Sequence, residues 1–259
     1  MGELDGRVAA ITGGTRGIGR AIAEAFLRDG AQVVVSGRDA AKGQRAIDEI
    51  DAGDRVHFVQ GDAAVRADCV RLIDETVARY GRIDILVNNA GGSANNAPVV
   101  DLTDEAMDYA LHLNLWSTFW CSRRALAHMI SQQWGRIINI SSLEGKVGKP
   151  GIAVYVTAKH AVNGLTKSMA HEVGALGITV NSLCPGAIET DMMKEEGTKA
   201  AASMGMAYED LLAWFSSESA IKRLNEVEDV ALVASLLASD AGAGITGSLI
   251  SIDGGTSPY

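Results

Sequence analysis

The chain is 259 residues long, with 47% hydrophobic and 21% charged residues and a formal net charge of −9. This hydrophobic content can build a packed core and excludes an intrinsically disordered chain, and the acidic balance argues against a nucleic acid as the main partner. No apolar run approaches the roughly 20 residues that cross a bilayer, so we expect no membrane association through a spanning helix.

Short apolar runs alternate with longer helical runs, and no break in composition marks a domain boundary. We predict strands at Arg7–Thr12, Gln32–Ser36, Val56–Gln60, Ile83–Asn88, Arg136–Ser141, Thr179–Leu183 and Ser248–Ile252. We predict helices at Ile18–Asp29, Ala40–Asp51, Arg66–Tyr80, Asp104–Ile130, Ala153–Leu176 and Val227–Ser239. Apolar strands without clean alternation are typical of a sheet covered on both faces. The pattern predicts an α/β fold, a single doubly wound (Rossmann) domain over residues 1–259 with a seven-stranded, mostly parallel sheet.

Cysteines, histidines and the N-terminus bear on the compartment and on metal binding. Cys69, Cys121 and Cys184 are odd in number and form no CxxC pair, and the five histidines make no HExxH. The segment Met1–Asp5 is short and acidic, without a basic and an apolar region, so we expect no export. We therefore expect a cytoplasmic protein without disulfide bonds and without a bound metal.

A glycine-rich turn follows the first predicted strand, with glycines at positions 13, 14, 17 and 19. Glycine permits positive φ angles and lets the backbone approach a pyrophosphate, and the helix that follows presents free N–H groups to phosphate. The spacing Gly-x3-Gly-x-Gly differs from the GxGxxG of the common dinucleotide-binding turn. A tight strand–helix turn without a ligand is the alternative interpretation.

Tyr155 and Lys159 are one turn apart in a predicted helix, so their side chains share a face. Carbonyl reduction needs a proton donor near neutral pH, whereas free tyrosine titrates at about 10. An adjacent ammonium favours the phenolate, and we expect Lys159 to lower the pKa of Tyr155. An exposed helix pair without a catalytic role is the alternative.

Together with further residues in the same order, these motifs resemble the short-chain dehydrogenase/reductase family. The similarity comprises the turn TGxxxGxG from Thr12, Asn88-Asn89-Ala90-Gly91, Asn114, Ser142, Tyr155-x3-Lys159 and Pro185-Gly186-x3-Thr190, and it covers nearly the whole chain. The resemblance implies an oxidoreductase that interconverts a ketone and a secondary alcohol by hydride transfer with a nicotinamide cofactor.

The resemblance also implies roles for individual residues. Tyr155 is the acid or base, the Ser142 hydroxyl bonds the substrate oxygen, and Asn114 holds a water that relays protons to Lys159. Ser141 is the alternative to Ser142, and a core asparagine is the alternative role for Asn114. The implied cofactor contacts are Gly13, Thr15, Arg16, Gly17, Ile18, Gly19, Arg38, Asp62, Asn88, Ala90, Gly91, Tyr155, Lys159, Pro185, Gly186, Ile188 and Thr190.

Three of these contacts have a specific place in the resemblance. Asp62 matches the residue at the adenine ring, although a surface carboxylate or a helix cap would explain it equally. Asn88 matches a contact near the adenine ribose that also braces the central sheet. Thr190 matches the residue that bonds the nicotinamide carboxamide.

Charge at the end of the second predicted strand bears on the choice between NAD and NADP. Position 37, which is acidic in NAD-preferring relatives, is Gly37, and Arg38 follows it. Arg38 and Arg16 provide two guanidinium groups that could bind a 2′-phosphate, and solvated arginines without a ligand are the alternative. Asp39 is the rival as a ribose ligand, although it suits the N-cap of the next helix. We therefore expect NADP(H), with NAD(H) as the alternative.

The segment 190–222 resembles the family's substrate lid, inserted within the domain. The expected substrate contacts are Ser142, Glu144, Tyr155, Met192 and Trp214. Asn95, Asn96 and Val147 lie in loops that we expect to face the same cleft. The substrate is expected to be a small carbonyl compound or alcohol. A 3-oxoacyl-(acyl-carrier-protein) reductase is the alternative. A carrier-protein partner would need a basic patch at the entrance, and the acidic chain shows no obvious one, which weakens this alternative.

Two other functions on the same fold are an enoyl reductase and a non-catalytic sensor, and the sequence disfavours both. An enoyl reductase would have six residues between tyrosine and lysine, and position 162 is Val162. A non-catalytic NADP(H)-binding sensor or scaffold would not need the catalytic residues that are present. The long helices 104–130 and 153–176 carry more apolar residues than one buried stripe needs, and with the resemblance they imply a homotetramer, with a dimer as the alternative.

Overall fold

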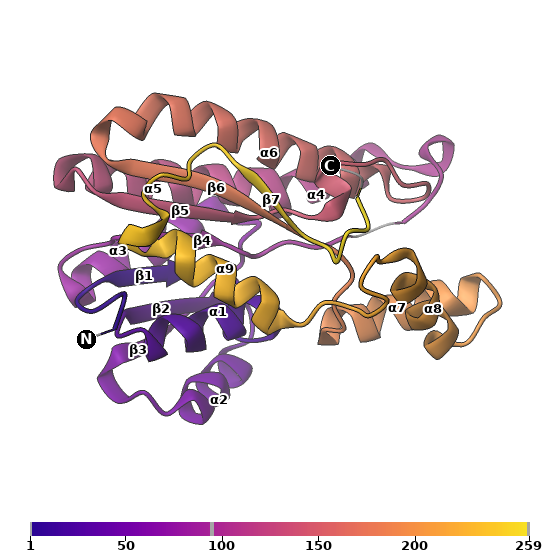
Figure 1. Cartoon of the computed structure of the whole chain (residues 1–259), viewed down its shortest axis with the longest axis horizontal. Coiled ribbons are helices and arrows are strands. Elements are labelled where there is room, and N and C mark those ends of the chain that lie inside the picture. The colour runs from indigo at the N-terminus through magenta and orange to yellow at the C-terminus, as the bar shows by residue number, and fades with distance from the viewer. Residues whose placement is uncertain (1, 94–95, 258–259) are drawn as a thin grey trace.

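The computed structural model describes residues 2–93 and 96–257. Over these residues the chain forms one seven-stranded sheet in the order β3-β2-β1-β4-β5-β6-β7 (Figure 1). Its strands are β1 (Val8–Ile11), β2 (Gln32–Gly37), β3 (Val56–Gln60), β4 (Ile85–Asn88), β5 (Gly135–Ile140), β6 (Ile178–Pro185) and β7 (Leu249–Ile252). Every pairing is parallel. The predicted doubly wound fold is confirmed.

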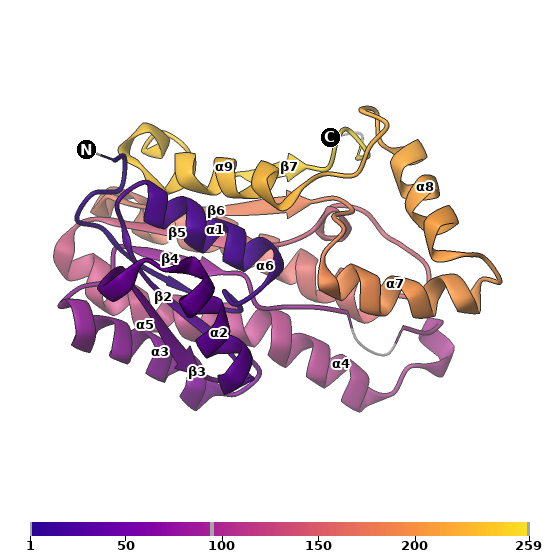
Figure 2. The ribbon, with the colours of Figure 1, turned by 90° about the horizontal axis from the view of Figure 1, so that it is seen from below.

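Helices cover both faces of this sheet (Figures 1 and 2). One layer is made of α1 (Gly17–Arg28), α2 (Ala40–Ile50) and α9 (Val227–Ala238). The other is made of α3 (Arg66–Tyr80), α4 (Asp104–Leu111), α5 (Ser117–Gln132) and α6 (Ala153–Val173). Two further helices, α7 (Asp191–Ser203) and α8 (Tyr208–Glu218), lie beyond the carboxyl end of the strands.

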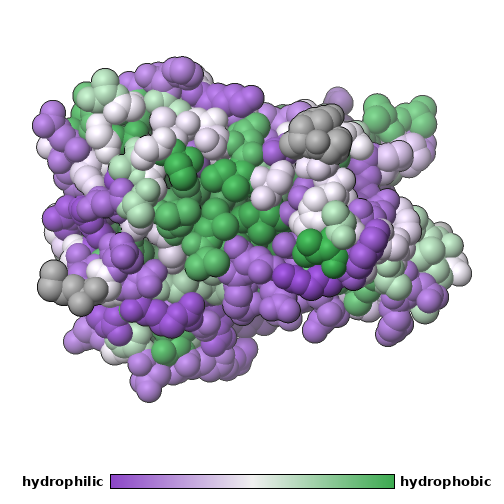
Figure 3. Space-filling view, in the orientation of Figure 1, coloured by the Kyte–Doolittle hydropathy of each residue, from purple (hydrophilic) through white to green (hydrophobic). Residues whose placement is uncertain are grey.

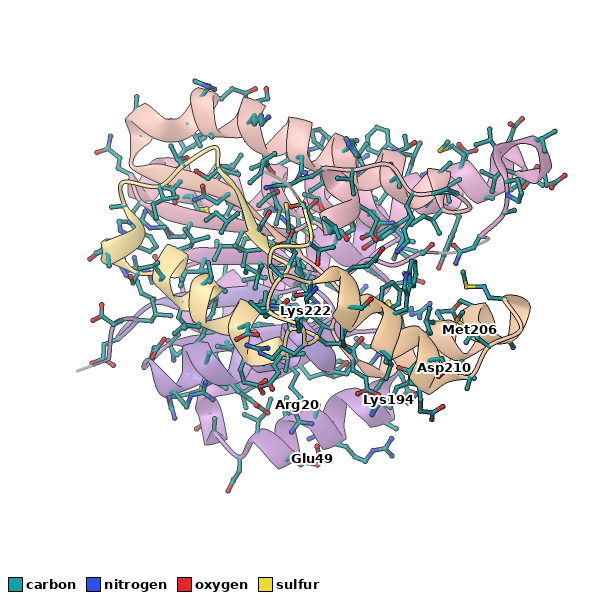
Figure 4. All side chains as sticks on the ribbon, turned by 45° about the vertical axis from the view of Figure 1, so that its right-hand side comes forward. Arg20, Glu49, Lys194, Met206, Asp210 and Lys222 are labelled. Carbon is teal, nitrogen blue, oxygen red and sulfur yellow. The ribbon has the colours of Figure 1, made fainter. Side chains whose placement is uncertain are left out.

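The residues of β1 show why the central strands are apolar throughout. Successive side chains of a strand point to opposite faces. Ala9 and Ile11 pack in the layer of α1 and α9, whereas Ala10 packs in the layer of α3 and α5. On the outside of the first layer, Arg20 of α1 donates to Glu49 of α2 at 2.6 Å (Figure 4). Two covered faces thus hold the carboxyl ends of the strands in a fixed arrangement.

The predicted helix 104–130 is wrong in its continuity. The structure has α4 and α5 joined by a π-helical turn, His112–Trp116. Two side chains donate hydrogen bonds to backbone carbonyls around this turn. The Thr118 hydroxyl donates to the Asn114 carbonyl (2.8 Å), and the Asn114 amide donates to the Ala110 carbonyl (2.9 Å). Such side-chain bonds compete with the regular helical ladder. The segment 190–222, to which we assigned no helix or strand from the sequence, forms α7 and α8.

The structure bears on membrane association, metal binding and disulfide bonds. None of the helices in the described part of the chain has the length and hydrophobicity to cross a membrane. Over residues 2–93 and 96–257, no three His, Cys, Asp or Glu side chains are grouped as metal ligands. The three cysteines are free and buried.

Candidate active site

Four side chains predicted to be catalytic meet at the carboxyl end of β5. Ser142 follows that strand, Tyr155 and Lys159 lie one turn apart on α6, and Asn114 comes from the π-helical turn. The side chains of Ser142 and Tyr155 are hydrogen-bonded. The Nζ atom of Lys159 lies 5.5 Å from the centre of the Tyr155 ring. Asn114, Ser142 and Lys159 are buried, and Tyr155 is partly exposed. The arrangement leaves a phenol accessible beside a buried cation.

The pKa of Tyr155 shifts in the direction opposite to the predicted one. Desolvation of the phenol and the charge of Glu144 raise the pKa of Tyr155, and the hydrogen bond with Ser142 opposes this only in part. The expected lowering by Lys159 is wrong for this structure. The Lys159 Nζ atom donates to the Ile140 carbonyl (2.8 Å), and it lies 5.5 Å from the centre of the Tyr155 ring. Tyr155 therefore keeps its proton at neutral pH.

Lys159 is a cation held in a desolvated place. Burial lowers the pKa of Lys159 to about 8, because a charged group loses hydration there. Gly91 makes this close packing feasible, since a Cβ atom at that position would lie 3.0 Å from Lys159 Nζ and 2.6 Å from Asn114 Oδ1. Both Gly91 and Asn114 therefore border the ammonium group.

Ser142 and its neighbour Ser141 have different surroundings. The Ser141 hydroxyl donates to the backbone carbonyl of Lys159 (3.3 Å), so it lies against α6. The Ser142 hydroxyl meets Tyr155 and the carboxylate of Glu144, the latter at 2.5 Å. This geometry favours Ser142 over Ser141 as the group that bonds a substrate oxygen.

Asn114 has both ends of its amide satisfied by the chain. Its nitrogen donates to the carbonyls of Ala110 (2.9 Å) and Gly92 (3.1 Å), and its oxygen accepts from the Gly92 N–H (3.1 Å). A buried amide needs such partners. Asn114 therefore fixes the loop after β4, in line with the core-asparagine alternative, and the water relay stays a prediction.

The glycine turn has the features that a cofactor pyrophosphate needs. Gly13 and Gly17 have φ angles of 65° and 54°. At the start of α1, Arg16 is the N-cap without a side-chain cap, and the first turn has no acidic residue. The free N–H groups and the helix dipole therefore suit a phosphate. A Cβ atom at Gly19 would lie 2.5 Å from the Gly13 carbonyl oxygen, so the helix packs tightly on the turn.

The end of β2 places the two arginines expected for a 2′-phosphate differently. Arg38 is exposed. Arg16 lies 3.3 Å from Glu195 of α7. Asp39 accepts from the Lys42 N–H (2.9 Å) and caps α2, which agrees with the helix-cap interpretation. A basic side chain, Arg38, therefore follows β2 directly, and the carboxylate of Asp39 is already engaged as a helix cap.

Asp62 follows the end of β3, and Asn88 is the last residue of β4. Asp62 accepts from the Ala64 N–H (2.9 Å) and lines a small hollow between β1, β2 and α3. Asn88 is buried, and its nitrogen donates to Ser122 (3.0 Å) and Asn139 (2.8 Å). Asn88 thus braces β4 against β5 and α5. The contacts of both residues with adenosine stay predictions.

Comparison with known proteins agrees with this geometry. The family model for short chain dehydrogenases matches residues 7–201. The chain belongs to the short-chain dehydrogenase family. It is 37% identical to D-beta-hydroxybutyrate dehydrogenase of Rhizobium meliloti over 96% of this chain and 98% of the relative. It is 36% identical to 3-oxoacyl-(acyl-carrier-protein) reductase of Haemophilus influenzae over 97% and 98%. A variant of actinorhodin polyketide ketoreductase with NADPH superposes with a TM-score of 0.94, at 30% identity, over 100% of both chains.

In this short-chain dehydrogenase, the residues after β6 close the site from one side. Gly186 donates its N–H to Ile252 (3.0 Å) and directly follows Pro185. Ile188 is buried. The side chain of Thr190 caps α7, and it lies 3.4 Å from where a Cβ atom of Gly17 would be. The segment 185–190 therefore runs beside the glycine turn.

Two of the expected substrate contacts, Met192 and Trp214, come from α7 and α8. Met192 of α7 lies 3.6 Å from where a Cβ atom of Gly92 would be, so it borders the loop after β4. Trp214 of α8 is 41% exposed. Asn96 accepts a hydrogen bond from Ser93. The loop residues expected at the cleft also include Val147, which is partly exposed, and Asn95, which lies outside the described residues.

Three residues organise this site in ways that the sequence analysis did not assign to them. The Thr12 hydroxyl accepts from the N–H groups of Asn89 (3.0 Å) and Ala90 (2.9 Å), and Asn89 donates to the Gly13 carbonyl (3.0 Å). Asn163 donates to the Gly145 carbonyl (2.8 Å). Asn163 had a signal, because positions 155, 159 and 163 share one helical face. Thr12 and Asn89 belong to the motifs quoted above, but the sequence does not show that they bond each other, because these bonds join segments far apart in the chain.

Proposed function

We propose that this protein is an NADP(H)-dependent oxidoreductase that interconverts a ketone and a secondary alcohol. The observation that carries the proposal is the Ser142–Tyr155 pair beside the buried Lys159, at the strand ends that border the glycine turn. The relatives support it, because their names are those of a hydroxybutyrate dehydrogenase and an oxoacyl reductase.

The residues of the chain divide the work as follows. The reduced nicotinamide supplies the hydride when the cofactor is bound. Ser142 bonds the substrate oxygen, and Tyr155 transfers its proton to that oxygen. The raised pKa of Tyr155 keeps this proton in place at neutral pH, which suits reduction. Lys159 contributes positive charge beside the phenol, and Asn114 holds the loop that borders the Lys159 ammonium.

NADP(H) is the cofactor that we propose, with NAD(H) as the weaker alternative. The turn 13–19 would hold the pyrophosphate, and Arg16 and Arg38 would bind the 2′-phosphate. The ketoreductase that this chain resembles in structure carries NADPH. The remaining proposed contacts are Asp62 and Asn88 on the adenosine side, and Ala90, Gly91, Tyr155, Lys159, Pro185, Gly186, Ile188 and Thr190 toward the nicotinamide.

The whole chain 1–259 is proposed to act as one domain, with 190–222 as its substrate lid. Met192, Trp214, Ser142, Glu144 and Tyr155 would contact a small carbonyl substrate. A 3-oxoacyl thioester on a carrier protein is the second candidate, favoured by the relative from Haemophilus influenzae. The net charge of −9 disfavours an acidic carrier protein and any nucleic-acid partner.

Assembly and compartment belong to the same proposal. We propose a homotetramer, supported by exposed apolar side chains on two faces. Trp116 in the π-helical turn and Ile130 on α5 are more than a third exposed, and Leu232 and Leu236 are exposed on α9. Hydrophobic side chains gather on the side of the molecule that carries α9 and β7 (Figure 3). Free, buried cysteines favour a reducing cytoplasm.

Cofactor titration followed by a substrate screen tests the proposal. We expect NADPH to bind more tightly than NADH, and the NADPH complex to reduce at least one class in a panel of simple ketones, hydroxy-ketones and 3-oxoacyl thioesters. Binding of NADPH without turnover of any class would instead fit a sensor or scaffold and would contradict the enzymatic proposal.

A further inference from the structure

The carboxylate of Glu144 lies between the proposed catalytic serine and a lysine of the following loop. One of its oxygens, Oε2, meets the Ser142 hydroxyl at 2.5 Å. The other, Oε1, lies 3.6 Å from the Nζ atom of Lys149. The Glu144 side chain is 17% exposed and that of Lys149 34%, so water screens the ion pair only in part. The two oxygens of one carboxylate thus connect a serine to a cation.

Lys149 has a second set of partners on α8. Its Nζ atom lies 4.8 Å from the centre of the Phe215 ring and 5.8 Å from that of Trp214. The two rings contact each other, with centres 5.2 Å apart. A cation at this distance over aromatic rings is held by their quadrupoles. Because α8 lies beyond the end of the sheet (Figure 2), Lys149 is a bridge from that helix to the loop after β5.

The hydrogen of the Ser142 hydroxyl is the point on which these contacts act. A hydroxyl has one hydrogen, and an ionised carboxylate can only accept. While Glu144 holds that hydrogen, it competes with a substrate oxygen that needs the same donor. The positive charge of Lys149 weakens Glu144 as an acceptor and so favours release of Ser142.

We propose that Lys149 is a positioning residue that couples α8 to Ser142 through Glu144. The inference rests on the proposed reduction of a ketone, in which Ser142 donates to the substrate oxygen. Contact of Trp214 and Phe215 with Lys149 keeps the cation beside Glu144, so the position of α8 sets how readily Ser142 is released to the substrate.

Steady-state kinetics of Lys149→Met in two backgrounds tests the coupling. In otherwise wild-type enzyme, we expect kcat/KM for the ketone to fall by about 2- to 5-fold, as for loss of a partly exposed ion pair. In Glu144→Gln enzyme, where no carboxylate charge remains, the same substitution should change kcat/KM by less than 1.5-fold. Lys149→Arg, which keeps the positive charge, should retain the wild-type kcat/KM. Lys199→Met, which removes an α7 lysine paired with Glu196, is the matched control and should have no effect.

Hydrogen exchange of α8 gives a readout that does not depend on turnover. Lys149→Met should speed exchange of the amides in 208–218, and Lys199→Met should not. The coupling would be overturned if Lys149→Met lowered kcat/KM equally in both backgrounds, or if the exchange of α8 stayed unchanged. In either case, turnover by the wild-type enzyme would still support the proposed reduction of a ketone. Wild-type protein that reduces no ketone would contradict the proposed function, and the exchange comparison would still decide whether Lys149 holds α8.

Discussion

At the scale of single residues, the charge of Lys159 sets the pH range of the site. Burial lowers the pKa of Lys159 to about 8, so the ammonium is present below that pH and is lost above it. The raised pKa of Tyr155 means that the phenol does not titrate in this range. We expect kcat/KM for NADPH, which reports on the free enzyme, to fall above an apparent pKa near 8. Lys159→Arg should move the fall to higher pH, and a profile that stays flat through pH 9.5 would contradict the assignment.

Two adjacent serines offer a second test at this scale. Removal of one donor to a developing oxyanion lowers kcat by about 10²- to 10³-fold in other enzymes. We expect a loss of that order for Ser142→Ala. Ser141 bonds the backbone of α6 and the side chain of Cys184, so Ser141→Ala should lower kcat by less than tenfold. Steady-state assays of both variants check this, and a reversed order would exchange the two roles.

At the scale of elements, an ion pair ties α7 to the glycine turn. Arg16 lies 3.3 Å from Glu195, and the side chains are 40% and 59% exposed. A 2′-phosphate would compete with Glu195 for the same guanidinium. Glu195→Gln should therefore lower the Kd for NADPH by about 2- to 5-fold, the range of an exposed pair. NADH lacks the 2′-phosphate, so its Kd should stay constant. An equal change for both cofactors would show that Arg16 does not select NADPH.

The positions of site residues were predictable from the sequence where a single helix or strand determines them. Tyr155 and Lys159 share a face because of helical periodicity, and Ser142 lies at the site because it follows a buried strand. The π-helical turn around Asn114 was not predictable, because it depends on side-chain bonds to particular carbonyls. The sign of the Tyr155 pKa shift was also out of reach, since it depends on desolvation and on the place of Glu144 in three dimensions.

At the scale of the whole molecule, the exposed apolar faces predict a homotetramer. Trp116 stacks on Trp120 with ring centres 5.8 Å apart and is 40% exposed, and Leu232 of α9 is 74% exposed. We expect light scattering at micromolar concentration to give the mass of four chains. Trp116→Glu and Leu232→Glu should each reduce the assembly to dimers, because a charge buried in either interface is costly. Val65→Glu, a similar change at 46% exposure elsewhere, should remain tetrameric; a monomeric wild-type protein would refute the assembly.

The most direct test of the account is the comparison of Tyr155→Phe with the wild-type enzyme. The variant lacks only the phenolic oxygen that is to protonate the substrate, so we expect kcat for ketone reduction to fall by about 10²-fold or more. The Kd for NADPH, measured by fluorescence titration of the same preparations, should stay within about twofold. A variant with wild-type kcat would contradict the assignment of Tyr155 as the proton donor and, with it, the proposed mechanism.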